Sequence, residues 1–232
     1  MGLSRIVEPE LMDTEDDALE YHAMDFSRAD GEFAETALGL MRDAANVAVV
    51  DFGTGTAKIP VLMGTRRKDL AILALDPAAE MLRVAVHHIA EHGLSNVVRT
   101  AKLDGRNTNL PAERFDFVMC NSTVHHMHEP LALFREMKRV LRPGGGLLVR
   151  DLERPATMDD AWTIVKRVAA GDSMKQQQLF FDSLCAGLTS AEVRQLLAQV
   201  GWSDLEVVRS SDRHWSVSRR LSPLDSSTPR LT

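Results

Sequence analysis

Two glycines placed directly after an apolar run constrain this chain more than any other feature of its sequence. The run Val47–Val50 leads into residues 51–57, which read Asp-Phe-Gly-Thr-Gly-Thr-Ala, and a helical pattern of apolar residues follows. Glycine lacks the Cβ atom that would keep a ligand away from the backbone, and it tolerates the positive φ of a tight turn. The N–H groups at the start of the next helix then face the ligand, with the helix dipole behind them. The pattern therefore predicts a strand, a ligand-binding turn and a helix.

Asp76 supports the interpretation of this turn as part of a nucleotide-type site. It follows Asp51 by 25 residues and stands at the end of a second apolar run, Leu70–Leu75. In α/β folds that bind nucleotides, a carboxylate at this place accepts hydrogen bonds from ribose hydroxyls. The glycine turn and Asp76 together favour a nucleotide-type ligand more than either feature does alone.

Apolar runs and amphipathic segments alternate along most of the chain. We expect strands at 47–52, 71–76, 97–102, 115–120 and 146–151, and two short strands at 203–208 and 214–218. We expect helices at 17–28, 31–44, 56–64, 77–92, 129–141 and 189–199, and one or two more within 157–186. Strands that are separated by helices form a parallel sheet with helices on both faces. The predicted class is therefore α/β, with a doubly wound, mostly parallel sheet.

The same pattern divides the chain into a helical arm, a main domain and a tail. Residues 1–45 hold 12 acidic and three basic side chains, so this arm is either a solvated acidic surface or a lid over the more basic body. Its first part, 1–16, has little periodicity, and we expect it to be mobile. Residues 46–218 form the main domain, in which 157–186 make a helical insertion after the fifth strand. We expect the tail, 219–232, to be disordered because serine and proline are frequent in it.

Composition excludes several functional classes. No apolar run approaches the roughly 18 residues that span a bilayer, and no basic region followed by an apolar core marks a signal peptide at the N-terminus. Only two cysteines, Cys120 and Cys185, occur in 232 residues, which favours a reducing cytoplasm over a disulfide scaffold. A Lys/Arg-rich tract with interleaved aromatic residues is absent, which argues against a nucleic-acid partner. We expect a cytoplasmic protein without membrane insertion; a homo-oligomer stays possible.

Four further motifs lie near the ends of predicted strands. Residues 104–105 (Asp-Gly) follow the third apolar run, 121–122 (Asn-Ser) end the fourth, 125–130 (His-His-Met-His-Glu-Pro) open the next helix, and 141–145 (Leu-Arg-Pro-Gly-Gly) precede the fifth strand. In open parallel sheets, ligands bind beyond the carboxyl ends of the strands, near the point where strand order reverses. Each aspartate or asparagine could alone be a strand-end cap or a turn residue. Together at one edge they favour a binding site.

These ordered motifs resemble those of the seven-stranded class I S-adenosylmethionine-dependent methyltransferases, over roughly residues 45–218. The chain is similar to the small-molecule branch that includes the quinone-biosynthesis C-methyltransferases, in which a His-His-x-x-x-Pro segment also follows strand four. The resemblance implies a Rossmann-like fold, S-adenosylmethionine as methyl donor, S-adenosylhomocysteine as product and a small-molecule acceptor. Ala57 departs from the pattern, because many members carry a third glycine there. We expect slightly looser packing at Ala57 but not lost binding.

The resemblance also implies roles for the residues of the first two strand ends. The methionine part of the cofactor would lie along the backbone of Gly53, Thr54 and Gly55. Asp51 would help to hold the amino group of the methionine part, directly or through water. Asp76 would bind the ribose hydroxyls.

Further residues match positions that contact the adenine in these enzymes. Pro77 and Met81 would lie against the ring. Asp104 would accept a hydrogen bond from the adenine amino group, and the Gly105 N–H would donate to the ring. With the preceding set, these residues would enclose the nucleoside.

The segment after the fourth strand is expected to face the methyl group that is transferred. Asn121 and Ser122 would offer backbone near the methionine carboxylate and the sulfonium. His125 and His126 follow, and either imidazole could accept a proton from an attacking hydroxyl, thiol or acidic carbon. The alternative is that one histidine caps a helix or hydrogen-bonds backbone while the other shapes the pocket. We favour His126 for the acceptor side.

Other functions stay open at this point. Residues 125–129 hold three histidines and a glutamate, but adjacent histidines point in different directions on a helix and no second cluster supplies ligands, so we expect no metal. A nicotinamide-dependent oxidoreductase would use a similar fold, although Lys58 occupies the last position of its Gly-x-Gly-x-x-Gly pattern. A non-catalytic S-adenosylmethionine-binding module is the third possibility.

Overall fold

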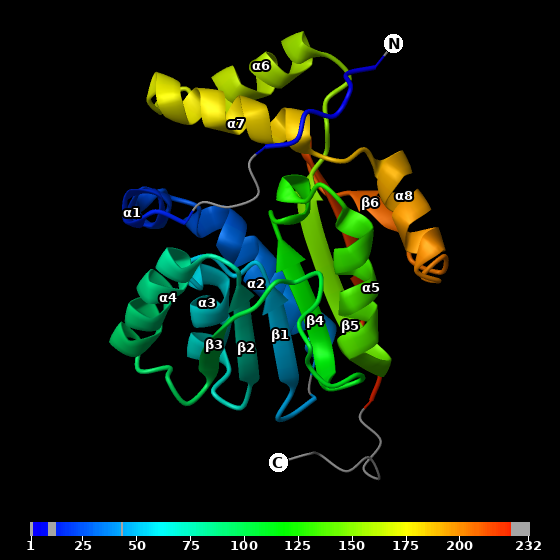
Figure 1. Ribbon diagram of the computed structural model, residues 1–232. Helices are drawn as coiled ribbons and strands as arrows, with labels where there is room; N and C mark the ends of the chain where they lie inside the picture. The colour runs from blue at the N-terminus through cyan, green and yellow to red at the C-terminus, as the bar shows by residue number, and fades with distance from the viewer. Residues whose placement is uncertain (1, 9–12, 43, 224–232) are drawn as a thin grey trace.

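Seven strands form a single sheet in the order β3-β2-β1-β4-β5-β7-β6 in the computed structural model, which describes residues 2–8, 13–42 and 44–223 (Figure 1). The strands are β1 Ala48–Phe52, β2 Ala71–Asp76, β3 Val98–Lys102, β4 Phe115–Asn121, β5 Leu141–Leu152, β6 Val207–Arg209 and β7 His214–Arg219. Strands β1 to β5 pair in parallel, whereas β7 runs antiparallel to β5 and β6. The strand order reverses between β1 and β4, which is where open α/β sheets bind ligands.

Helices cover both faces of the sheet. Side chains of α2 (Ser27–Met41), α3 (Lys58–Arg66) and α4 (Ala79–Glu91) form one buried apolar cluster with the sheet, and those of α5 (Pro130–Val140) and α8 (Ser190–Gln199) form the other. The central strands are therefore buried on both sides, which is why they read as continuous apolar runs and not as alternating ones. The α/β class with a mostly parallel, seven-stranded Rossmann-like sheet is confirmed.

Three more helices lie near the carboxyl ends of β1 and β4 (Figure 1). They are α1 (Glu15–Ala23), α6 (Met158–Val168) and α7 (Met174–Ala186). The last two form a small apolar cluster of their own, in which the rings of Trp162 and Phe181 stack with centroids 4.5 Å apart. Ser173 begins α7 with a capping box that it shares with Gln176. Each of these helices thus has its own N-cap or packing contacts and is not a simple crossover.

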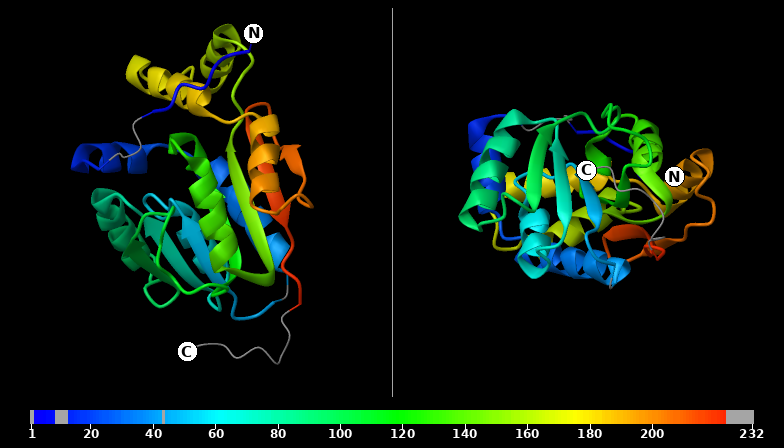
Figure 2. Two further views of the ribbon diagram at one scale, coloured as in Figure 1. Left: turned by 45° about the vertical axis from the view of Figure 1, so that its right-hand side comes forward. Right: turned by 90° about the horizontal axis from the view of Figure 1, so that it is seen from below.

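Residues 2–8, which we call the N-terminal strap, run along α7 (Figure 2). The Leu3 N–H donates to Ala156 O at 2.9 Å and the Ile6 N–H donates to Cys185 O at 3.2 Å. The strap therefore has defined partners, in contrast to the mobile segment expected for residues 1–16. Residues 9–12 of that segment lie outside the described residues.

Several expected boundaries were wrong. The helix predicted at 17–28 ends at Ala23, and Ser27 starts α2. The histidines at 125–126 lie in a 3-10 turn, η1 (Val124–His126), and α5 begins only at Pro130. Strand β5 starts earlier than expected, at Leu141, with a register irregularity against β4.

The expected disordered tail at 219–232 also needs correction in its first part. Arg219 ends β7, Leu221 is buried and its N–H donates to Leu40 O, and the Ser222 N–H donates to Gly144 O. Residues 224–232 lie outside the described residues. Among the helices that the structure describes, none combines the length and apolar character needed to cross a membrane.

Candidate active site

A cleft opens beyond the carboxyl ends of β1, β2 and β4. Of the residues that the sequence proposes for the site, those that line this cleft are Gly53, Gly55, Asp76, Pro77, Met81, Gly105, Ser122 and His126. The cleft is also lined by Tyr21 of α1, which belongs to none of the sequence motifs, and by Thr123 and Met127 of the turn after β4. Residues from five separate parts of the chain therefore meet at the point where the strand order reverses.

The glycine turn after β1 has the geometry that a backbone-lined site needs. Gly53 has φ of 72°, and a Cβ atom placed on it would collide with the Thr123 side chain. The N–H groups of Gly53 and Thr54 donate to Leu75 O at 2.9 and 2.8 Å, which ties the turn to β2. Ala57 has φ of 59°, a left-handed conformation that costs a non-glycine residue about 1–2 kcal/mol. Alanine in place of the third glycine at position 57 therefore affects the backbone conformation as well as the packing.

Asp76 closes the turn from the other side. Its Oδ2 accepts the Gly55 N–H at 2.8 Å and its Oδ1 accepts the Ala78 N–H at 2.9 Å. Burial raises the pKa of Asp76, and these two hydrogen bonds oppose that rise. The carboxylate thus lines the cleft at the end of β2, as the motif predicts.

Asp51 lies beneath the turn and is buried, with 3% of its surface exposed. Burial, opposed by the nearby Thr54 hydroxyl and assisted by the charges of Asp76 and Asp30, raises the pKa of Asp51 to about 7. Asp30 on α2 has its pKa raised to about 6, also by burial. These three aspartates, which we call the carboxylate trio, make this end of the cleft suited to a cation. Of the three, only Asp76 lines the cleft; Asp30, Asp51 and the neighbouring Thr54 do not.

Two other predicted residues use their side chains elsewhere. The Asp104 carboxylate is bound by Arg106, whose Nη2 lies 2.8 Å from Oδ2, and this ion pair holds the pKa of Asp104 below its usual range. The Asn121 Oδ1 accepts a hydrogen bond from Arg150 Nε at 2.9 Å. At both positions, the neighbouring Gly105 and Ser122 line the cleft instead.

His125 does not face the cleft. It is 4% exposed, and its Nδ1 lies 2.6 Å from Asp151 Oδ1. Burial alone would lower the pKa of His125, but the charge and hydrogen bond of Asp151 outweigh burial and raise it. Asp151 also accepts the N–H groups of Thr123 and Val124 at 2.8 and 2.5 Å and that of Leu152 at 2.6 Å. Of the two candidate bases, His125 is thus the one that Asp151 binds beneath the turn.

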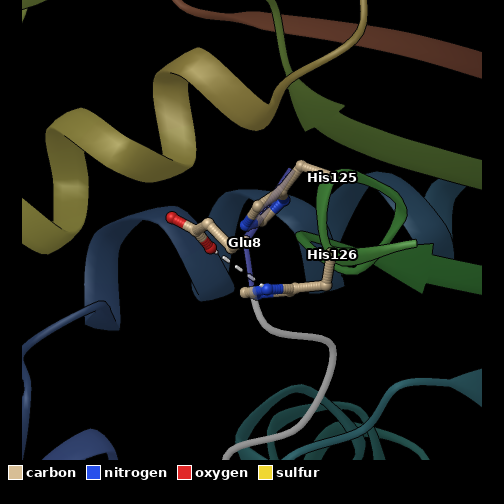
Figure 3. A group of neighbouring side chains, drawn as sticks. All are labelled: Glu8, His125 and His126. Atoms are coloured by element: carbon tan, nitrogen blue, oxygen red, sulfur yellow. Dashed lines mark ion pairs between the residues drawn. The ribbon is translucent and has the colours of Figure 1, made fainter. Parts of the chain in front are cut away.

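His126, by contrast, lines the cleft and contacts the N-terminal strap (Figure 3). Its Nδ1 lies 3.2 Å from Glu8 Oε2, with side-chain exposures of 27% for His126 and 14% for Glu8. Sequence reasoning missed both Glu8 and Asp151. Asp151 follows the fifth apolar run as the other aspartates follow theirs, so a signal existed; Glu8 gave none.

Among the described residues, one group has the composition of a metal site: Glu8, His125 and His126. One potential ligand atom from each residue lies within 4.8 Å of the other two. A tetrahedral zinc with bonds of about 2.0–2.1 Å holds its ligand atoms about 3.4 Å apart. The group would have to contract before it could coordinate zinc, and it carries no argument for a metal here.

Comparison with known proteins agrees with this geometry. A family model described as a methyltransferase domain matches residues 50–149. Methyltransferase GfsG of Streptomyces halstedii is 30% identical over 122 residues, and the ubiquinone/menaquinone biosynthesis C-methyltransferase UbiE of Hahella chejuensis is 31% identical over 117 residues. The alignments cover 53% and 50% of this chain but only 44% and 46% of those relatives. The chain thus matches less than half the length of these curated relatives.

Solved structures match over more of the fold. A SAM-dependent methyltransferase from Aquifex aeolicus superposes with a TM-score of 0.65 at 21% identity, covering 90% of this chain and 99% of that one. The plantazolicin methyltransferase BpumL, solved in complex with SAH, gives 0.64 at 14% identity and covers 89% of each chain.

The sheet order, the glycine turn at its switch point and the matching domain model make this chain similar to the S-adenosylmethionine-dependent methyltransferases. Residues 50–149 are the part of the chain that matches the methyltransferase domain.

Proposed function

We propose that this protein transfers a methyl group from S-adenosylmethionine to a small-molecule acceptor held in the cleft. The observation that carries the proposal is the convergence of the glycine turn, Asp76 and His126 on one cleft at the switch point. Relatives named for ubiquinone and menaquinone biosynthesis, and a structural neighbour named for plantazolicin, support a small organic acceptor.

The residues present fit the cofactor at its methionine end. The Gly53–Gly55 backbone would pass the methionine part, since a side chain at Gly53 has no room beside Thr123. Asp51, within the carboxylate trio, would receive the ammonium group directly or through water, because a buried carboxylate is stabilised by an adjacent cation. The sulfonium adds a second positive charge to the same region.

The nucleoside end fits with one change from the expected roles. Asp76 would bind the ribose hydroxyls, and Pro77 and Met81 would lie against the adenine. The Gly105 N–H would donate to the ring. Asp104 can accept from the adenine amino group only if it shares its carboxylate with Arg106. At the other end, Ser122 and the Asn121 backbone would lie near the methionine carboxylate.

The acceptor would enter between the sheet edge and the surrounding helices. Residues 157–186, which contain α6 and α7, would act as the helical cover of the acceptor pocket, and residues 1–45 as an arm that closes it. His126 lies on this side of the cleft. Methyl transfer from a sulfonium is an in-line displacement, so the chain mainly needs to align the acceptor atom and remove its proton.

Calorimetry with S-adenosylmethionine, S-adenosylhomocysteine and NADH tests the cofactor. We expect binding of the first two and none of NADH; the reverse result would favour a nicotinamide-dependent oxidoreductase.

A screen for methyl transfer tests catalysis. Quinols, phenols and other hydroxylated small molecules should include an acceptor that yields methylated product together with S-adenosylhomocysteine. Tight cofactor binding without turnover on any acceptor would instead favour a non-catalytic S-adenosylmethionine-binding module.

A further inference from the structure

The N-terminal strap contacts the side chain of His126 and the backbone on either side of it. Glu8 Oε1 accepts a hydrogen bond from Ser183 Oγ of α7 at 2.9 Å, and its Oε2 faces His126 Nδ1 (Figure 3). Arg5 Nη2 donates to the carbonyl oxygens on either side of His126, at 3.0 Å for His125 and 2.8 Å for Met127. Two charged side chains of one short segment therefore fix the same residue of the cleft.

The contact between Glu8 and His126 determines which imidazole nitrogen carries the proton. His126 Nδ1 is buried and lies 3.2 Å from Glu8 Oε2 without an aligned hydrogen bond to it. Because an ionised carboxylate accepts and does not donate, a neutral His126 beside Glu8 would carry its proton on Nδ1. Burial would raise the pKa of Glu8, but its contacts with His126, His125 and Ser183 lower it, which keeps Glu8 ionised. The free lone pair of His126 is then on Nε2, the nitrogen left to a molecule in the cleft.

We infer that Glu8 is a positioning residue for His126, and that the acceptor belongs to the compounds whose attacking atom carries a proton, such as a hydroxyl or phenol. This inference rests on the proposed function. The same arrangement of carboxylate, imidazole and reacting group activates nucleophiles on unrelated folds. Here the carboxylate comes from a segment 118 positions before the histidine in the sequence.

The reaction step balances with these groups alone. The acceptor atom forms a bond to the methyl carbon while the carbon–sulfur bond breaks, and the electron pair of that bond stays on sulfur, which becomes the neutral thioether of S-adenosylhomocysteine. The proton of the acceptor atom passes to His126 Nε2. Glu8 stabilises the resulting imidazolium, and solvent takes the proton after product leaves.

Histidine NMR tests the positioning role without any acceptor. The chain has eight histidines, and comparison with His126→Ala assigns the His126 signals. In the wild type, with and without S-adenosylhomocysteine, nitrogen chemical shifts of the neutral ring should show the proton on Nδ1. In Glu8→Ala the ring should become a mixture of both tautomers. A wild-type ring protonated on Nε2, or a tautomer unchanged by Glu8→Ala, would overturn the inference.

Kinetics with an acceptor from the methylation screen give the second readout. Glu8→Gln should lower kcat by about 10–100-fold, because the imidazolium loses its counter-charge, while S-adenosylhomocysteine affinity stays within about threefold.

Glu20→Gln is the matched control, because Glu20 also joins the N-terminal region to α7, through Lys175 Nζ at 3.0 Å, but does so on the surface. It should leave the rate and the His126 tautomer unchanged. Methylation that is as fast in Glu8→Gln as in the wild type would refute Glu8 and leave the proposed function standing. Absence of methylation in the wild type would refute the proposed function while the NMR result still decides the Glu8 contact.

Discussion

Replacing Asp151 with alanine should destabilise this protein more than most single substitutions. Asp151 is 1% exposed and accepts four hydrogen bonds, three from backbone N–H groups and one from the His125 ring. Removing one member of a buried charge pair costs about 3–5 kcal/mol, because the other member is left buried without a partner. Three N–H groups also lose their acceptor. Since water can enter the emptied space and satisfy part of the turn, we expect the loss to stay within about 3–5 kcal/mol.

Urea and thermal unfolding would measure this loss. With an unfolding entropy of about 2.1 cal/mol/K per residue, a 232-residue chain loses about 2 °C of Tm for each kcal/mol. Asp151→Ala should therefore lower Tm by about 6–10 °C. Asp151→Asn keeps the shape and one acceptor oxygen, so its loss should be smaller. Glu20→Gln, which removes a surface ion pair, should not change Tm measurably.

The loss should depend on pH in a defined direction. The pKa of Asp151 is lowered by His125 and the N–H donors despite burial, so its contribution is present above about pH 4 and is lost as pH falls further. The pKa of His125 is raised by Asp151 despite burial, so its contribution is full below about pH 6.5 and declines as pH rises through the raised value. Wild type and Asp151→Ala should differ most between about pH 4 and 6.5. A difference below about 1 kcal/mol throughout that window would refute the reasoning.

Three further expectations concern cofactor binding. Asp76→Ala should weaken S-adenosylmethionine binding by about 1.5–3 kcal/mol, because the ribose hydroxyls lose charge-assisted hydrogen bonds; unchanged affinity in a folded variant, measured by calorimetry, would remove Asp76 from the site. Affinity should rise between about pH 6 and 8, because the ammonium group lowers the pKa of Asp51 from about 7 and binding then releases a proton. Calorimetry in buffers of different ionisation enthalpy should detect that proton near pH 7 in the wild type but not in Asp51→Asn, and its absence from both would contradict the ammonium contact. Gly53→Ala should weaken cofactor binding at least tenfold and lower Tm, since its methyl group meets Thr123 at a positive φ; adding Thr123→Ala should recover part of both, and a Gly53→Ala protein with wild-type affinity would show that the turn can shift.

Short-range signals predicted most of the fold. The glycine turn at 53–55, the run that ends at Asp76 and the helix expected at 189–199 each depend on residues close together in the chain, and each lies where the sequence places it. A boundary failed where a local turn interrupts a continuous pattern. Asp25 accepts the Ser27 N–H at 3.0 Å, which begins a new helix inside the segment read as one.

The candidate site was less predictable because side-chain direction is a tertiary property. His125 and His126 are neighbours in the sequence, yet one binds Asp151 beneath the turn and the other lines the cleft. The 3-10 turn that contains both histidines sets the directions of their side chains. The helix expected from the sequence did not define these directions. Glu8 could not be found from the sequence at all, because its position depends on contacts with α7 and on the path of the strap.

The strap also has a consequence for how the protein matures during translation. Arg5 Nε donates to Ala186 O at 2.7 Å, across 181 positions of the chain. The strap is therefore synthesised long before its partner, which follows the five parallel strands in the chain. Contacts of such separation form late, because a long loop must close before they contribute any stability. We expect the nucleotide half of the site to be competent for binding in the nascent chain before His126 acquires Glu8, so that cofactor binding precedes the assembly of the acceptor side.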